Sequence, residues 1–116
     1  MAAGGFRLTG LNLGTVSDPA VQFTGDTNTG VYSSAADTVD VTTGGVRAAS
    51  FATVAAGVNY LELNPSITAV AVTLDAEGTD TNVSIDVRPK GSGVLTVDGE
   101  PVATIFSSIF SSQVFS

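Results

Sequence analysis

The sequence contains no cysteine and no histidine. The lack of cysteine excludes disulfides and thiolate catalysis, and the lack of histidine excludes imidazole acid–base chemistry and the Ser-His-Asp arrangement. Together the two absences exclude zinc sites of the usual kind. Tryptophan is also absent and tyrosine occurs only twice, so no aromatic cluster accompanies the carboxylates that a glycoside hydrolase would need. We therefore predict that the chain is not an enzyme, has no catalytic residues and binds no cofactor.

Positively charged residues are scarce as well. The chain carries 4 Lys and Arg against 11 Asp and Glu, which gives a net charge of −7. The basic surface that binds nucleic acid is therefore missing, and an anionic membrane surface would repel the chain. No apolar run approaches the roughly 20 residues of a membrane-spanning helix. We expect neither nucleic acid nor a membrane among its partners.

Charged residues of both signs make up only 13% of the 116 residues, whereas hydrophobic residues make up 43%. This composition is too apolar for a disordered chain, and the length indicates one domain. Much of the surface must therefore consist of Thr, Ser, Asn and Gly. Uncharged faces rich in threonine suit β-sheets, and they also suit surfaces that are buried between subunits.

Short alternating segments separated by turn residues occupy residues 19–53. Residues 25–30, GDTNTG, are predicted to form a turn, because their Asp and Asn side chains bond to nearby amides and glycine supplies positive φ. Residues 38–43 alternate between valine on one face and Thr or Asp on the other, which predicts a strand. Gly44 and Gly45 predict the next turn. Strands this short, at a spacing of 8–12 residues, favour an all-β fold.

The second half of the chain follows a small-residue break, residues 55–57, that we interpret as a hinge between two blocks. Residues 67–74 are predicted to form a strand that is apolar on both faces, and in so small a chain another subunit is the simplest cover for the second face. Residues 75–82 are predicted to form a polar loop. Residues 83–88 alternate, and Asp98-Gly99 is a strong hairpin signal.

Both ends of the chain carry apolar residues in an otherwise polar setting. One interpretation is a frayed N-terminus with a docked edge strand and a C-terminal tail that folds back over its own core. The other is a pair of arms that dock on sister subunits or another partner, because several aromatic residues in a short tail would otherwise be exposed. The residues predicted to dock are Phe6, Leu8, Leu11, Leu13, Ile105, Phe106, Ile109, Phe110 and Phe115.

Asp75, Glu77 and Asp80 place three carboxylates within six residues, a grouping that can bind a hard cation. A solvated acidic loop is the favoured interpretation. Residues 26–37 begin like a calcium-binding loop but lack Gly at position six and Glu at position twelve. We therefore predict no metal site.

Two stretches resemble segments of tailed-bacteriophage virion proteins. Residues 19–51 contain PAVQF, GDTNTGVYS and AADTVDVTTGGVRA, the same order of strand, turn and strand that tail-fibre and head-fibre-like proteins carry. Residues 60–102 contain LDAEGTDTNVSIDVRPKGSGVLTVDGEPV, which is similar to the D-T-N and P-K-G-S-G segments of those proteins. The resemblance implies a virion structural protein built from trimeric β-structured modules. It supplies no catalytic residues.

The expected fold is an all-β, short-stranded antiparallel β-sandwich or β-prism-like module that forms a homotrimer. We expect an N-terminal arm at 1–18, a β domain at 19–102 and an apolar tail at 103–116. Fibre proteins are usually longer, so this chain is expected to be a complete capsid decoration (cement) protein on the surface of the virion. It would stabilise the head by bridging subunits of the major capsid protein. The alternatives are a tail-fibre or head-fibre module that attaches to the host surface, and a sugar-active or sugar-binding protein outside any virion, against which the scarcity of aromatic residues argues.

Overall fold

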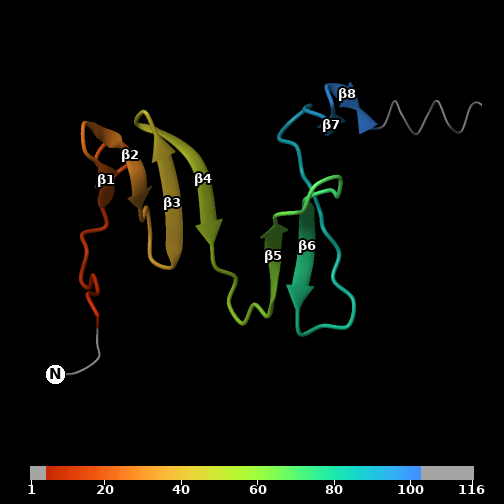
Figure 1. Cartoon of the computed structure of the whole chain (residues 1–116), viewed down its shortest axis with the longest axis horizontal. Coiled ribbons are helices and arrows are strands. Elements are labelled where there is room, and N and C mark those ends of the chain that lie inside the picture. The colour runs from red at the N-terminus through yellow and green to blue at the C-terminus, as the bar shows by residue number, and fades with distance from the viewer. Residues whose placement is uncertain (1–4, 103–116) are drawn as a thin grey trace, which may run out of the picture. The chain divides into compact units, whose positions relative to one another are not determined.

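The computed structural model describes residues 5–102, whose secondary structure consists of short antiparallel strands (Figure 1). They form one four-stranded sheet and two two-stranded sheets. The prediction of an all-β fold with short antiparallel strands is confirmed. The chain divides into two compact units, Met1–Gly57 and Val58–Ser116. Within the described residues, no helix is long and apolar enough to cross a membrane.

The first unit holds the four-stranded sheet, in which each strand is antiparallel to the next. Its strands are β1 (Val21–Phe23), β2 (Asp26–Tyr32), β3 (Thr38–Thr43) and β4 (Val46–Ala52), and they lie side by side in chain order. Gly44 and Gly45 both have positive φ and form the two-residue turn between β3 and β4. Such a turn requires positive φ at both central positions, so the prediction of a turn here is confirmed.

The predicted turn at residues 25–30 is wrong, because most of this segment belongs to β2. The turn itself consists of Thr24 and Gly25, and the strand begins at the next residue. Gly30 pairs with β1 on one side and β3 on the other. A Cβ at Gly30 would collide with the carbonyl of Val21. The glycine in this segment therefore lets two backbones approach closely inside a sheet, and pairing on both sides outweighs the local preference for a turn.

The sheet buries its polar face. Tyr32, Asp40 and Thr42 point to the same side, since Tyr32 pairs with Asp40 in the register. All three are buried. Valine residues of the same strands occupy the opposite side and are largely exposed. The alternation of β3 was predicted correctly, but burial falls on the face that carries the Thr and Asp side chains.

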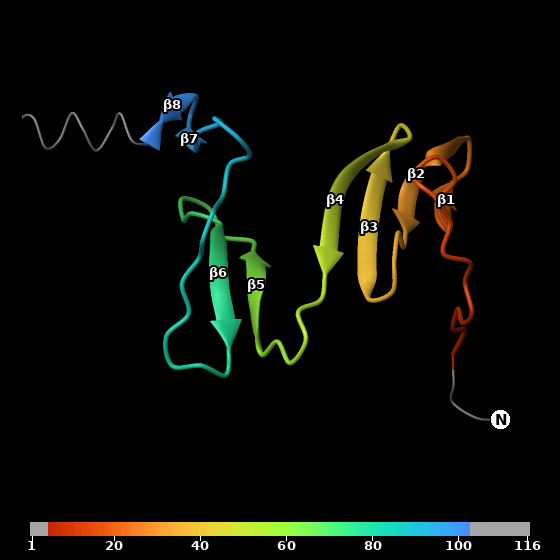
Figure 2. The same ribbon diagram turned by 180° about the vertical axis from the view of Figure 1, so that it is seen from behind.

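The chain that precedes β1 bonds to groups of this polar face, and it runs beside β1 in the view from behind (Figure 2). The Thr42 hydroxyl donates a hydrogen bond of 2.7 Å to the carbonyl of Val16, and the amide of Ser33 donates one of 2.8 Å to the carbonyl of Leu13. Pro19, beside the start of β1, is buried as well. Residues 13–19 therefore act as a lid that satisfies polar groups of the sheet with backbone carbonyls.

The second unit contains two small sheets. Their strands are β5 (Asn59–Asn64) paired with β6 (Thr73–Gly78), and β7 (Thr96–Val97) paired with β8 (Glu100–Pro101). Asp98 and Gly99 form the two-residue turn between β7 and β8 with positive φ at both positions, which confirms the predicted hairpin. Residues 83–88 alternate in sequence as noted, but they belong to no strand of the described chain.

The predicted doubly apolar strand at residues 67–74 is wrong. Only its last two residues are in β6, which continues through Gly78 and so takes in half of the predicted polar loop at 75–82. Residues 67–72 instead form a loop, in which the amide of Val70 donates to the carbonyl of Ile67 and Ala69 has a φ of 65°. The hairpin pairs Leu61 with Ala76, Leu63 with Leu74 and Asn64 with Thr73, and this matching of like residues favours the register, although Tyr60 pairs with Glu77.

Candidate interaction surfaces

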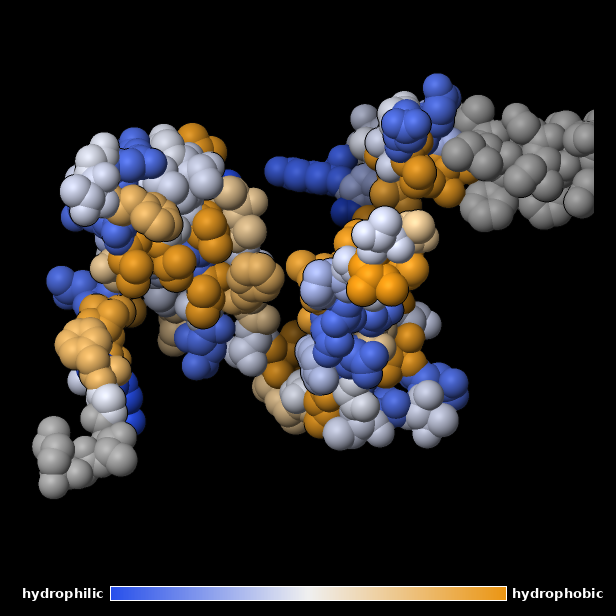
Figure 3. Space-filling view, viewed as in Figure 1, coloured by the Kyte–Doolittle hydropathy of each residue, from blue (hydrophilic) through white to orange (hydrophobic). Residues whose placement is uncertain are grey.

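An exposed apolar surface covers one side of the four-stranded sheet. Cross-strand pairing places Val21 beside Val31, Val31 beside Val41, and Val39 beside Phe51. We call this set the open face; it consists of Val21, Val31, Val39, Val41, Ala49 and Phe51. Phe51 is 61% exposed. The space-filling view shows hydrophobic residues gathered over this sheet (Figure 3).

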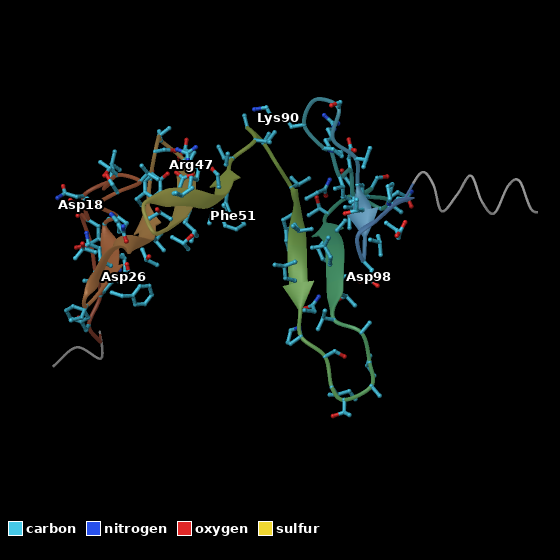
Figure 4. The ribbon with its side chains drawn as sticks, turned by 90° about the horizontal axis from the view of Figure 1, so that it is seen from above. Asp18, Asp26, Arg47, Phe51, Lys90 and Asp98 are labelled. Atoms are coloured by element: carbon cyan, nitrogen blue, oxygen red, sulfur yellow. The ribbon has the colours of Figure 1, made fainter. Side chains whose placement is uncertain are left out.

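The two sides of β4 differ in character. Phe51 lies on the open face, whereas Arg47 lies on the side of the buried polar residues (Figure 4). β4 is also an edge strand, because it pairs only with β3. One strand thus presents an apolar face and an open backbone edge, and both features are typical of strands that pair with another chain.

Two of the predicted docking residues lie next to the open face. Leu11 and Leu13 line an open groove of about 230 Å³ together with Val21, Val31 and Val39. Phe6 and Leu8 are exposed and line no part of this groove. The structure therefore places Leu11 and Leu13 of the predicted N-terminal arm beside an apolar surface of the sheet. The predicted docking residues Ile105, Phe106, Ile109, Phe110 and Phe115 lie outside the described residues.

A charged cluster that the sequence did not reveal lies on the polar side of the sheet. The side chain of Asp40 is completely buried, and its Oδ2 accepts a hydrogen bond of 2.8 Å from the amide of Ser34. Arg47 approaches from β4, with its Nε 3.6 Å from Oδ1 of Asp40. The same Nε donates a hydrogen bond of 2.8 Å to the hydroxyl of Tyr32. Arg47 therefore binds the tyrosine directly and balances the charge of the buried carboxylate from a longer distance.

The environment of Asp40 favours its charged form. Hydrogen bonding from Ser34 and Ser50, with a smaller contribution from the charge of Arg47, lowers the pKa of Asp40 from 3.8 to about 2, although burial opposes this shift. Oδ1 accepts no hydrogen bond from the residues that the structure describes. An ion pair of this kind fixes the position of β4 relative to β3 more than it adds net stability. The Asp40 carboxylate is enclosed by the sheet and the Arg47 side chain is half exposed, and the cluster joins β2, β3 and β4.

The signal for this cluster in the sequence is weak. Arg47 is one of only 4 positively charged residues, and Asp40 is the one charged residue on the inner face of β3. A lone Arg near an Asp on an alternating strand does not specify that the two will meet, since their pairing depends on a one-residue irregularity between β3 and β4.

The three acidic residues considered for a cation are engaged with amide and hydroxyl groups. Asp75 accepts hydrogen bonds from Asn64 at 2.7 Å and from Thr73 at 2.6 Å, and Asp80 accepts one of 2.7 Å from Asn59. Glu77 points to the same face of β6 as Asp75 and is exposed. Within residues 5–102, no group of three acidic side chains is arranged to hold a metal ion.

A second open groove, of about 590 Å³, belongs to the second unit. One wall is the apolar side of the β5–β6 hairpin, with Leu61, Leu74 and Ala76, and the other wall is the extended segment 83–88. The polar side of the hairpin faces away and carries Glu62, Asp75 and Glu77, since alternate residues of a strand point to opposite faces.

No family model, curated protein or solved structure matches this chain.

Proposed function

We propose that the chain is a non-enzymatic structural protein of a bacteriophage virion, and that it assembles as a homotrimer. In this assembly the sheets of three copies form a β-sandwich or β-prism-like module around a threefold axis. The trimer decorates the capsid and stabilises the head by bridging subunits of the major capsid protein.

The observation that carries the proposal is the near absence of a hydrophobic core. Tyr32, at 4% exposure, is the one large hydrophobic residue that is buried among the described residues. Burying a Val, Leu or Phe side chain contributes about 1.5–3 kcal/mol, and this is the main favourable term in folding. A chain with 43% hydrophobic residues, of which residues 5–102 bury so few, would gain most of its stability by burying them in an assembly.

The residues that carry the resemblance to phage proteins have clear structural roles. The glycine that ends GDTNTG, Gly30, allows the close approach of β1 to β2. The following tyrosine, Tyr32, contacts Arg47, which stands just after the T-G-G turn. The motif therefore encodes one sheet with a buried polar face and an open apolar face. A sequence pattern that specifies a sheet with an exposed apolar face supports the use of that face for assembly.

The proposed mechanism is stabilisation by preferential binding. A protein that binds the assembled capsid and not its separate subunits stabilises the assembled form by mass action. The exposed Phe6 and Leu8 of the N-terminal arm are suitable anchors for a capsid surface, because apolar residues that insert into pockets dominate binding energy at interfaces. The net charge of −7 favours docking on basic patches of the capsid.

Electron microscopy of phage particles tests the proposal. An antibody raised against the purified chain should label the heads of virions that contain it, and purified chain should bind to heads from which it has been removed. Label along the tail or on fibres would instead support a host-attachment module. The absence of the chain from purified virions would contradict both functions.

A further inference from the structure

The second unit has no core within the described chain. None of residues 58–102 is buried, whereas the first unit buries residues of β2 and β3 under its lid. An isolated two-stranded hairpin is marginally stable in water, and the second unit consists of two such hairpins joined by irregular segments. These residues therefore need a surface outside the unit in order to hold the β5–β6 structure.

The β5–β6 hairpin keeps its carboxylates off the side that carries its leucines, although Tyr60 shares the acidic side, where it pairs with Glu77. Leu61 pairs with Ala76 and Leu63 pairs with Leu74 on one side. The acidic residues Glu62, Asp75 and Glu77 occupy the other side. Two copies can therefore bring their apolar sides together without bringing acidic groups together, although each chain carries a net charge of −7.

The backbone hydrogen bonding of residues 83–88 is also incomplete within the described part of the chain. This segment is extended and carries exposed Ile85 and Val87, yet its amides and carbonyls have no backbone partner in the part of the chain that the structure describes. β5 and β6 pair only with each other, so each leaves one edge open. The second unit thus holds both an extended segment without a pairing partner and two open strand edges, which is the combination that pairing between two copies would complete.

We propose that the second unit folds by strand exchange with a second copy of this chain. Residues 83–88 of one copy add to an open edge of the β5–β6 hairpin of the next, and the apolar sides of the hairpins pack together across the same contact. A contact that joins two different surfaces repeats from copy to copy and closes into a ring when the rotation allows. This inference rests on the self-association in the proposed function, but not on the presence of the chain in a virion.

Cross-linking from single cysteines tests which chain covers the apolar side. The natural sequence has no cysteine, so Ala76→Cys on the apolar side and Glu77→Cys on the acidic side each carry one thiol. The full-length chains are labelled there with a photoactivated cross-linker, mixed as equal amounts of ¹⁴N and ¹⁵N protein, and analysed by mass spectrometry. We expect light-to-heavy cross-links at several-fold higher yield from Ala76→Cys than from Glu77→Cys, with residues 58–102 of the second copy as the acceptor.

Cross-links from Ala76→Cys that remain within one chain, or that are no more frequent than those from Glu77→Cys, would overturn the inference. Hydrogen exchange on the natural chain gives a second readout that needs no variant. Amides of β5, β6 and residues 83–88 should lose protection together on dilution, and protection that is independent of concentration would also overturn it. If the chain binds capsids but forms no light-to-heavy cross-links, this inference is wrong and the proposed function stands. If the cross-links form but the chain is absent from virions, the proposed function is wrong and this inference stands.

Discussion

The Cζ atom of Arg47 lies 5.8 Å from the centre of the Tyr32 ring, and the Nε of the same guanidinium donates a hydrogen bond of 2.8 Å to the tyrosine hydroxyl. This contact joins β4 to β2 across β3, because the two residues lie on strands that are not neighbours. It also keeps a positive charge beside the buried carboxylate of Asp40. The contact thus holds together the three strands that form most of the open face.

Replacing this arginine should destabilise the fold. Arg47→Met leaves the buried Asp40 carboxylate without a balancing charge and removes the hydrogen bond to Tyr32, and an unpaired charge in a buried site is strongly destabilising. The matched control is Arg88→Met, since Arg88 pairs with Asp86 in a site where its side chain is 84% exposed. Urea unfolding at equal chain concentration should show a clear decrease in the midpoint for Arg47→Met and a change within about 0.5 kcal/mol for Arg88→Met. Equal effects would contradict the structural role of the cluster.

The pH dependence of stability should reflect Asp40. Its pKa is about 2 in the folded chain and 3.8 ordinarily, so it binds its proton more weakly when folded. Its contribution to stability is therefore complete above about pH 4 and is lost as the pH falls through about 2. Urea midpoints measured between pH 5 and pH 2 should fall less steeply for Asp40→Asn than for the natural chain. Parallel curves for the two proteins would show that Asp40 does not titrate as described.

Gly30 should tolerate no larger residue. Gly30→Ala places a methyl group against the carbonyl of Val21 inside the sheet, and the backbone there cannot yield without breaking the pairing of β1 with β2. We expect a loss of about 3 kcal/mol in the free energy of unfolding. Gly5→Ala is the control, because no atom lies within 4 Å of the position of its Cβ, and it should change stability by less than about 0.5 kcal/mol. A stable Gly30→Ala protein would argue against this placement of β2.

A charged residue on the open face should weaken the association of the copies. Val39→Lys places an ammonium group beside Phe51 on this face, whereas Ala52→Lys places the same group on the opposite side of β4. Sedimentation velocity should show dissociation at a concentration at least about tenfold higher for Val39→Lys, which corresponds to about 1.4 kcal/mol. Ala52→Lys should leave the assembly unchanged. Identical behaviour of the two variants would mean that the open face is not the interface.

The sequence predicts local features of this fold more successfully than the placement of its elements. The turns at Gly44-Gly45 and Asp98-Gly99 are correct because positive φ is a property of those residues themselves. The errors at residues 25–30 and 67–74 arise where pairing across strands decides the conformation. Aspartate, asparagine and glycine in β2 are turn formers by local preference, and their strand depends on two neighbouring strands that a short sequence window does not contain.

The sequence also does not predict which side of the sheet is buried. Alternation along β3 separates valine from Thr and Asp, but it does not say which face the chain covers. The usual assumption places valine inside. Here the lid supplies backbone carbonyls that suit the Thr42 hydroxyl, so the polar face is covered and the valines remain open. The Tyr32–Arg47 contact could not be predicted either, because it forms only when the polar side of the sheet is the covered one.

The mass of the purified full-length chain at micromolar concentration tests the central claim, which is that the open surfaces are completed by other copies of the chain. Light scattering coupled to size-exclusion chromatography reports this mass independently of shape. We predict three times the 11.6 kDa of a single chain. A mass of 11.6 kDa for a folded chain at that concentration would contradict the account.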